Sequence, residues 1–276
     1  MEEKTFKAMV MRYWHRHGRH DLPWRRTTDP YRILVSEVML QQTQVIRVID
    51  FYLSFLRAFP SFRALARATP ASVLRVWQGL GYNRRALMLL RCAKVAADEY
   101  KGKLPDDYEA LRALPGIGPY TAGAVLAFAF DRPVPVIETN IRRVYLHHFF
   151  PKRRKVPDSD ILPIVIRHSL SVSSPRDWYS ALMDYGSWLA TQAENPNTRS
   201  KHYTRQSAFE GSQRQLRGAV VRVLVSQARM VASAIAAATG KPPKEIKVVM
   251  EKLEREGFVA RCAHAWCVHN PHWSLR

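Results

Sequence analysis

The chain has 276 residues, with 43 Lys or Arg against 23 Asp or Glu, so its formal net charge at pH 7 is +20. This charge favours a polyanionic partner, and the 47% of hydrophobic residues are ample for the core of one large domain or two smaller ones. No apolar run reaches about eighteen residues, and the start, Met-Glu-Glu-Lys, does not resemble a signal peptide. We therefore expect a soluble, intracellular protein rather than a membrane-spanning or secreted one.

Most of the chain is predicted to be helical. Pro30 opens a long helix whose apolar period continues to Phe59, and Pro60 ends it. No convincing strand pattern occurs before residue 258. The expected fold class is therefore mainly α. Further helices are expected at 6–17, 61–67, 70–77, 83–100, 107–113, 120–130, 140–149, 158–170 and 175–190.

The most informative stretch is residues 114–125, Leu-Pro-Gly-Ile-Gly-Pro-Tyr-Thr-Ala-Gly-Ala-Val. A helix stops at Pro115, Gly116 and Gly118 permit a tight turn, and Pro119 suits the first turn of the next helix. This pattern predicts a helix-hairpin-helix. The N–H groups of its turn point outward, with the positive end of a helix dipole behind them, so the turn is shaped to hold one DNA phosphate. It is also compatible with a bound monovalent cation.

The composition changes after residue 194. We expect a catalytic domain at 1–194 and a linker or DNA-tracking loop at 195–212, which is polar and poor in aliphatic residues. Residues 213–276 then show three helices and a hairpin, the pattern of a winged helix-turn-helix. Its last helix, 243–255, mixes acidic and basic residues. A role on DNA or its opposite strand and a purely structural or protein-binding role both stay open.

Two carboxylates stand in apolar surroundings, Glu37 within Leu-Val-Ser-Glu-Val-Met-Leu and Glu138 after Val-Pro-Val-Ile. A glutamate among aliphatic residues is either a paired structural acid or a group whose pKa is raised for proton donation. Two such glutamates with a DNA-binding hairpin between them favour a catalytic role over a structural one. Cleavage of an N-glycosidic bond uses such a pair, one acid for the departing base and one anion for the charge on the sugar.

Four further motifs stand beside the hairpin: Pro-Trp-Arg-Arg at 23–26, Asp-Pro-Tyr at 29–31, Ser-Glu-Val-Met-Leu-Gln-Gln-Thr-Gln-Val at 36–45 and Trp-Gln-Gly-Leu-Gly-Tyr-Asn-Arg-Arg-Ala at 77–86. Together they closely resemble the helix-hairpin-helix (HhH-GPD) DNA glycosylases, above all the MutY-type adenine glycosylases. The resemblance covers about residues 5–190. It implies a two-lobed helical fold and a monofunctional base-excision-repair enzyme that hydrolyses the N-glycosidic bond of a flipped adenine mispaired with guanine or 8-oxoguanine.

By this resemblance, four residues carry the chemistry. Glu37 is the acid that protonates the flipped adenine at N7, and Glu138 occupies the place of the family's catalytic aspartate. Asn140 matches the asparagine two residues beyond that aspartate. Tyr120 falls where bifunctional relatives carry a Schiff-base lysine, so lysine-based strand cleavage is not expected. Tyrosine at this position also occurs in thymine mismatch enzymes, so it does not indicate which base the enzyme releases.

The resemblance also implies a DNA-binding set. Gln41, Gln42 and Tyr82 match residues that enter or line the gap left by the extruded nucleotide, where stacking and hydrogen bonds offset the cost of unstacking. The ordinary alternative for Tyr82 is a loop aromatic. Arg84 and Arg85 are expected to contact phosphates, with solvated surface charges as their alternative. The full set is Gln41, Gln42, Tyr82, Arg84, Arg85, Gly116, Gly118 and Thr121 for DNA, with Trp24 and Arg26 near the adenine pocket.

The sequence departs from the family in three respects. The four cysteines that hold an iron-sulfur cluster after the catalytic body are missing, so no cluster and no other cofactor is expected. The MutT-like C-terminal domain that inspects 8-oxoguanine is also missing, and the winged module takes its position. Glu138 replaces aspartate, which moves the carboxylate by about 1.5 Å at a site where it faces a cationic sugar.

The three cysteines, Cys92, Cys262 and Cys267, do not indicate a disulfide framework, which fits a reducing compartment. The segment from Cys262 to His272 contains enough Cys and His for zinc, but its spacing is not that of a usual finger. Side chains on a hairpin alternate between faces and do not all converge. A wing with partly buried cysteines is therefore favoured over a metal site.

The expected partner is double-stranded DNA with a mispair or lesion, bound by a monomer in the cytoplasm at the nucleoid. Three other functions stay open at this point. They are a thymine or uracil glycosylase, a glycosylase for another purine such as hypoxanthine, and a catalytically impaired protein that binds lesions. Glu138 and the missing cluster favour the last, and Glu37, Tyr120 and Asn140 oppose it.

Overall fold

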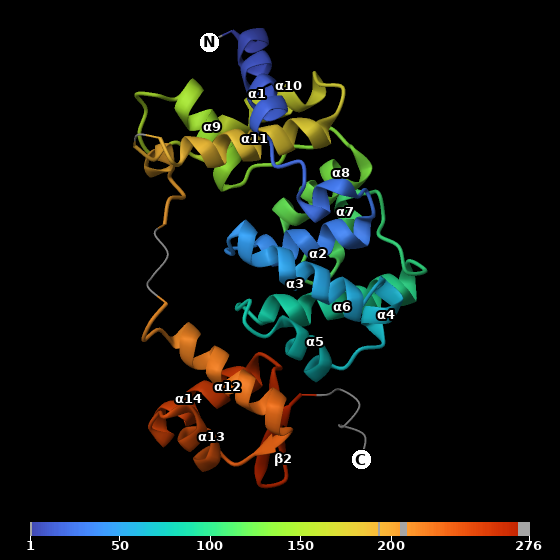
Figure 1. Ribbon diagram of the computed structural model, residues 1–276, viewed down its shortest axis with the longest axis vertical. Helices are drawn as coiled ribbons and strands as arrows, with labels where there is room; N and C mark the ends of the chain where they lie inside the picture. The colour runs from blue at the N-terminus through green and yellow to red at the C-terminus, as the bar shows by residue number, and fades with distance from the viewer. Residues whose placement is uncertain (1, 193, 205–208, 270–276) are drawn as a thin grey trace. The chain divides into compact units, whose positions relative to one another are not determined.

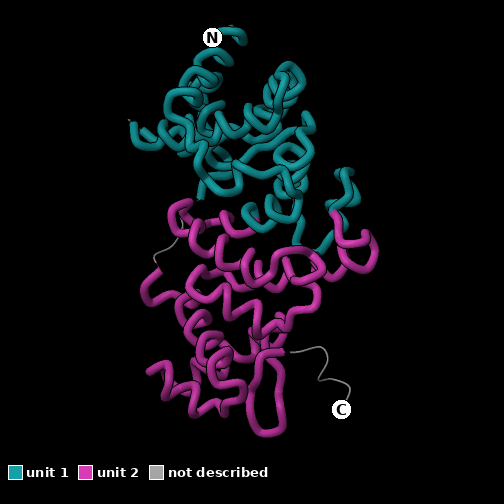
Figure 2. Tube along the Cα trace, turned by 45° about the vertical axis from the view of Figure 1, so that its right-hand side comes forward, with its two compact units in different colours: residues 1–37, 104–205 teal, residues 38–103, 206–276 magenta. Residues whose placement is uncertain are grey.

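The computed structural model describes residues 2–192, 194–204 and 209–269, and it is mainly helical, as expected (Figure 1). The chain forms two compact units (Figure 2). Unit 1 comprises residues 1–37 and 104–205, and unit 2 comprises residues 38–103 and 206–276. None of the described helices is long and apolar enough to cross a membrane.

Unit 1 is built around α8, whose residues 121–129 are all buried. Helix α11 packs against α9 and α1, and Phe6 of α1 lies edge-on to Trp178 and Phe149 in the same core. Its complete elements are α1 (Glu3–His17), η1 (Pro23–Arg26), α7 (Tyr108–Ala113), α8 (Pro119–Phe130), α9 (Thr139–Phe149), α10 (Asp158–Leu170), α11 (Pro175–Leu189) and η2 (Pro196–Arg199). Helix α2 (Pro30–Leu40) begins in this unit, and the boundary follows Glu37.

Unit 2 combines two groups of helices with a small sheet. The sheet has the order β1-β3-β2, and both pairs are antiparallel. The three helices and the hairpin expected at the C-terminus are present, and β1 adds a strand that the sequence did not predict. Its elements are α3 (Val45–Ala58), α4 (Phe62–Ala66), α5 (Pro70–Trp77), α6 (Arg84–Glu99), α12 (Gln213–Gln227), β1 (Arg229–Met230), α13 (Ala232–Thr239), α14 (Pro243–Arg255), β2 (Val259–Cys262) and β3 (Ala265–Val268).

The single helix expected from Pro30 to Phe59 is wrong, because the chain breaks between α2 and α3. Gln42 in the break has a left-handed φ of 57°. Arg85 reaches the end of α2 and donates from Nη1 to the carbonyls of Val38 and Met39, both at 2.9 Å. A cation that satisfies the last carbonyls stabilises a helix end. The apolar period continues across this break, so local sequence gave no sign of it.

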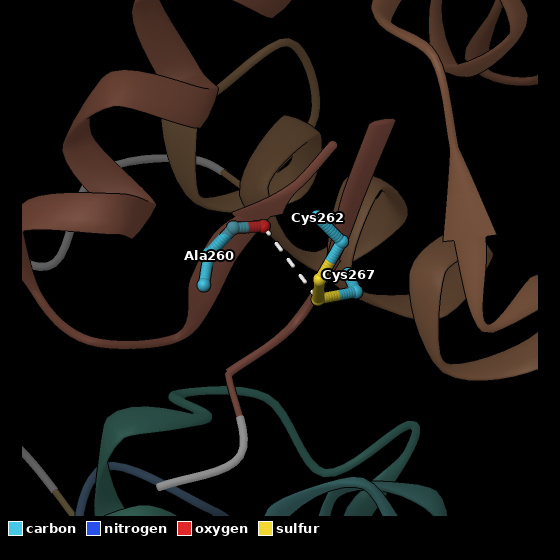
Figure 3. The surroundings of a disulfide bond; sticks show 3 residues. All are labelled: Ala260, Cys262 and Cys267. Carbon is cyan, nitrogen blue, oxygen red and sulfur yellow. Dashed lines mark hydrogen bonds between the residues drawn. A yellow bond between two sulfur atoms is a disulfide. The ribbon is translucent and has the colours of Figure 1, made fainter. Parts of the chain in front are cut away.

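The expectation of no disulfide is also wrong, since Cys262 and Cys267 are joined in the β2–β3 hairpin (Figure 3). Cys262 pairs with Ala265 across the hairpin, so Cys267 is its diagonal neighbour on the same face. Their Cα atoms are 6.2 Å apart, within the usual range for a disulfide. The described residues contain no group of three or more potential metal ligands. The histidine at position 272 lies outside the described residues.

Unit 1 also contains a buried charge cluster that the sequence did not reveal. Asp184 of α11 is 3% exposed and binds Arg25 through two parallel hydrogen bonds, at 2.9 and 3.0 Å. Arg19 donates to the same carboxylate from Nε at 2.6 Å and from its backbone N at 2.8 Å. These bonds connect the segment after α1 to α11. The buried carboxylate is unfavourable without cationic partners, so both arginines are needed there.

Asp184→Ala is expected to lower the free energy of unfolding by about 3 kcal/mol, because two arginines lose their buried counter-charge. Asp106→Ala is the control, since Asp106 pairs with the more exposed Arg132 and such surface pairs contribute little to stability. Urea unfolding of both variants measures the difference. Equal losses would show that the Asp184 cluster is no more important than a surface ion pair.

Candidate active site

Glu37 is buried within the apolar helix α2, with 6% of its surface exposed. Its neighbours Leu34, Val35 and Val38 are also buried, so the helix places this carboxyl among aliphatic side chains. Oε2 accepts a hydrogen bond of 2.7 Å from the hydroxyl of Tyr120. Tyr120 lies in the first turn of α8, directly after the hairpin. The helix-hairpin-helix therefore positions a side chain that binds Glu37 directly.

Glu138 is the N-cap of α9. Its Oε1 accepts hydrogen bonds from the backbone N–H groups of Asn140 and Ile141, at 2.7 and 2.8 Å. Oε2 also lies 3.4 Å from the Asn140 amide nitrogen. A carboxylate suits this position because the first N–H groups of a helix lack partners and the helix dipole is positive there. The extra methylene relative to aspartate is thus absorbed by a side chain that folds back on its own helix.

The two carboxyl groups influence each other's protonation. Burial, opposed by the hydrogen bond from Tyr120 and assisted by the nearby Glu138 charge, raises the pKa of Glu37 to about 7. Burial also raises the pKa of Glu138, although the two backbone N–H groups and Arg143 oppose this. Burial and Glu37 hold the pKa of Tyr120 well above its usual value, so its hydroxyl stays a donor. The site therefore holds a carboxyl that exchanges a proton near neutral pH.

A polar network fixes the start of α9. Arg143 is 7% exposed and donates from Nη1 to Asn140 Oδ1 at 2.6 Å and to the Gly186 carbonyl at 2.7 Å. Its Nε donates to Asn195 Oδ1 at 3.2 Å. A Cβ on Gly186 would lie 2.3 Å from the Asn140 carbonyl oxygen, so only glycine permits this approach of α11 to α9. Sequence reasoning missed Arg143, Gly186 and Asn195, because their roles depend on contacts distant in sequence.

Part of the segment expected as a linker is packed within unit 1. Asn197 is buried and donates from Nδ2 to the Thr139 carbonyl at 3.0 Å. Ser200 forms a parallel bridge with Val156. Arg199 donates to the carbonyls of Leu146 and Pro151. Residues 195–200 therefore support the helix that carries Glu138 and Asn140, while their use as a DNA-tracking loop stays a prediction.

The hairpin turn has the geometry that its glycines predict. Gly116 is exposed and has a φ of 78°, and Ile117 N donates to the Leu114 carbonyl at 3.2 Å. Gly118 is the N-cap of α8, and nothing lies within 4 Å of a Cβ built on it. This open backbone suits a phosphate. Thr121, by contrast, is buried in α8, so its side chain does not present a surface to DNA.

In unit 2, the Tyr82 loop (residues 78–83) has an unusual backbone. Gly79, Gly81 and Tyr82 all have positive φ, at 101°, 84° and 50°. The Tyr82 hydroxyl donates to Gln42 Oε1 at 3.2 Å, so two of the predicted gap-filling residues are in direct contact. Gln41 lies beside Gln42 in the break between α2 and α3 and is partly exposed. A non-glycine residue at positive φ is uncommon and is retained where the surroundings impose it.

The arginines and the tryptophan singled out in the sequence have different environments. Arg85 was expected on a phosphate, but its guanidinium binds protein carbonyls, including Gly81 O at 3.1 Å, so we correct its role to holding the break and the Tyr82 loop. Arg84 is exposed and remains available to DNA. Arg26 pairs with Asp21 at the surface, whereas its neighbour Arg25 is the buried one. Trp24 is buried.

Comparison with known proteins places these features in a family. Residues 35–160 match the family model described as HhH-GPD superfamily base excision DNA repair protein. The chain is 38% identical over 231 residues to an adenine DNA glycosylase of Mycolicibacterium smegmatis, covering 76% of this chain and 78% of that protein. It is 48% identical over 132 residues to an adenine DNA glycosylase of Mycobacterium tuberculosis, covering 48% of this chain and 43% of that protein.

One solved structure is similar over a comparable span. A thermostable thymine-DNA glycosylase superposes with a TM-score of 0.59 at 26% identity, covering 67% of this chain and 85% of that one. The matched family region contains Glu37, Tyr120 and Glu138 together with the hairpin. The residues that the geometry assembles thus lie in the part of the chain that defines the family.

The raised pKa of Glu37 predicts a pH-dependent stability. Because the folded pKa of about 7 exceeds the ordinary 4.5, the folded protein binds this proton more tightly, and stability falls as pH rises from 4.5 through 7. Glu37→Gln removes this loss. The unfolding free energy of Glu37→Gln minus that of wild type is therefore expected to rise by about 3 kcal/mol between pH 4.5 and pH 8.

Urea unfolding of wild type and Glu37→Gln across this pH range measures the effect. Glu109→Gln, an amide substitution at an exposed position of α7, is the control against which the change is compared. A Glu37→Gln difference that does not vary with pH would mean that Glu37 ionises as an ordinary surface carboxyl does.

Proposed function

The chain belongs to the HhH-GPD superfamily of base excision DNA repair proteins, and from this we propose that it hydrolyses the N-glycosidic bond of an adenine mispaired with guanine or 8-oxoguanine. It is a DNA glycosylase, and DNA is its partner. The observation that carries the proposal is the buried Glu37 carboxyl, whose pKa lies at about 7 next to a second carboxylate. We also propose that it acts as a monomer in the cytoplasm, at the nucleoid.

Glu37 acts as the general acid. With the Tyr120 hydroxyl donating to Oε2, the other carboxyl oxygen is left to carry the proton. Transfer of this proton to N7 of the extruded adenine neutralises the charge that develops on the leaving base. The bond between the sugar and the base then breaks, and its electron pair leaves with the base. A carboxyl with a pKa near the working pH combines a populated acid form with sufficient acidity.

Glu138 stabilises the sugar as it becomes cationic. Its two backbone N–H donors and Arg143 favour the charged form of this carboxylate, although burial disfavours it. The same N–H bonds fix its position at the start of α9, which matters because an anion must face the oxocarbenium-like centre closely. Water then adds to the sugar, loses a proton to the solvent and leaves an abasic site. Tyr120 has no amine, so the lysine-based strand cleavage of bifunctional glycosylases is not part of this mechanism.

The iron-sulfur cluster that the resemblance associates with the family does not fit this chain. Such a cluster needs four thiolates or equivalent donors, and the whole chain has three cysteines. Cys92 is buried in α6, and the other two are bound to each other in the hairpin. We propose that the enzyme works without a cluster, and that the contacts of residues 195–200 with Arg143, Thr139 and Val156 take over its structural role.

A pyrimidine mismatch glycosylase is the second candidate. It is favoured by the similarity to a thermostable thymine-DNA glycosylase and by Tyr120, a residue compatible with both activities. Glu37 favours adenine, because a purine offers N7 as a site for protonation and a pyrimidine lacks this atom. A lesion-binding protein without activity is the third candidate, and a Glu37 that exchanges its proton near neutral pH opposes it.

Base release from five duplexes distinguishes these candidates: A:8-oxoguanine, A:G, hypoxanthine-containing, T:G and U:G. Wild type is expected to release adenine from the first two, and Glu37→Gln to lose at least about a hundredfold in single-turnover rate, because the amide has no proton of suitable acidity. Glu138→Gln keeps an oxygen that caps α9 but loses the charge, and a similar loss is expected.

Glu109→Gln, at an exposed position of α7, is the matched control for both amide substitutions. Adenine release that survives Glu37→Gln would contradict the mechanism. Preferential release of thymine or uracil would instead establish the second candidate. Tight lesion binding without release from any of the five duplexes would establish the third.

A further inference from the structure

A side chain of the C-terminal helices, Arg214, contacts the Tyr82 loop. Arg214 lies in the first turn of α12, 132 residues beyond Tyr82 and in the same unit. Its Nη1 donates to the Tyr82 hydroxyl at 2.5 Å, and its guanidinium carbon lies 5.3 Å from the centre of the Tyr82 ring. It thus binds both the polar end and the aromatic ring of one side chain. No motif in the sequence indicated this contact.

The backbone of the Tyr82 loop is fixed independently of Arg214. Trp77 Nε1 and Arg85 Nη2 both donate to the Gly81 carbonyl, at 3.0 and 3.1 Å. Arg47 donates to the Gly79 carbonyl. Since the backbone is held on both sides of the turn, what remains to be set is the direction of the Tyr82 side chain.

Two segments set that direction. Gln42 accepts a hydrogen bond from the Tyr82 hydroxyl, and Arg214 donates a hydrogen bond to the same hydroxyl oxygen. Arg85 also lies against the ring, with its guanidinium carbon 5.3 Å from the centre. A hydrogen bond from a charged donor and a cation against an aromatic ring are both stronger than neutral contacts. The phenol is therefore held in one orientation before any DNA arrives.

Arg214 is in turn anchored by the fold of the C-terminal segment. Ser212 caps α12 by accepting from Gln215 N at 3.2 Å. One turn along the helix, Arg217 forms two hydrogen bonds with Glu256, at 3.0 and 2.6 Å. Arg214 also lies 5.4 Å from the ring of Phe209, which is exposed. Helices α12 and α14 thereby determine where the Arg214 guanidinium sits.

We propose that Arg214 is a positioning residue for Tyr82, and that the C-terminal helices take part in base extrusion through this contact. The inference rests on the proposed function and on the role that the family resemblance implies for Tyr82, which is to fill the gap left by the extruded nucleotide. A side chain that is already ordered loses less freedom on entering the base stack than one that must be ordered there. The C-terminal segment thus contributes to catalysis through Tyr82 rather than through phosphate contacts alone.

Extrusion is measured by stopped-flow fluorescence with the full chain and a duplex carrying 2-aminopurine, an adenine analogue that brightens on unstacking, opposite 8-oxoguanine. At saturating protein, Arg214→Met is expected to slow extrusion about tenfold, since a charged hydrogen bond to Tyr82 is lost. Arg222→Met is the matched control, because Arg222 is exposed on the same helix and its loss changes the charge equally.

A double-mutant cycle separates this role from a structural one. In the Tyr82→Phe background, which lacks the hydroxyl, Arg214→Met is expected to lose at most about threefold, because the hydrogen bond is already absent. The same tenfold loss in both backgrounds would overturn the proposal, since Arg214 would then act on DNA and not on Tyr82. Equal rates for Arg214→Met and Arg222→Met would also overturn it.

A second variant covers the case in which Arg214→Met does not fold. Phe209→Ala removes an exposed ring that supports Arg214 and is expected to slow extrusion about threefold. An unchanged rate in Phe209→Ala would then count against the proposal. Wild type that produces no fluorescence change with this duplex would overturn the proposed function itself, whereas normal extrusion in every Arg214 variant would overturn only the inference.

Discussion

The burial of one carboxyl group beside another is the constraint on which the rest of the structure depends. Glu37 lies inside an apolar helix, and the hydroxyl of Tyr120, which donates a hydrogen bond to it, does not neutralise its charge. With Glu138 nearby, ionising both groups is unfavourable, so the proton is retained on Glu37 up to about neutral pH. The same arrangement that makes Glu37 an acid therefore lowers the stability of the folded chain as the pH rises from 4.5 through 7.

The scaffold holds this costly arrangement in place with polar contacts around it. Arg143 connects Asn140 at the start of α9 with Gly186 on α11 and with Asn195 beyond it. Asp184 binds Arg25 just before α2. These networks fix the start of α9, which presents Glu138, and the segment that leads into α2, which carries Glu37. A carboxylate that must face a cationic sugar needs this kind of rigid support.

Sequence alone gave the parts of the site that depend on local patterns. The hairpin follows from Pro115, Gly116 and Gly118, because turn and helix-start preferences act over a few residues. Glu37 stood out because it is an acid in an apolar run. The mainly helical class and the C-terminal helices with their hairpin are confirmed for the same reason.

The missed features all depend on contacts between distant residues. The break after Leu40 is held by Arg85, which is more than forty residues away, so a continuous apolar period concealed it. The disulfide depends on a hairpin register that spacing does not specify. Arg25 and Arg26 are equivalent in sequence, and only Asp184 distinguishes the buried one from the exposed one.

The most direct test of the account is the carboxyl pKa of Glu37 itself. A pH titration by carbon-13 NMR of protein with labelled glutamate, with Glu37→Gln used to assign the signal, measures it without any substrate. The account predicts a midpoint at about pH 7. A midpoint near 4.5, the ordinary value for glutamate, would show that burial does not hold the proton and would contradict the central claim.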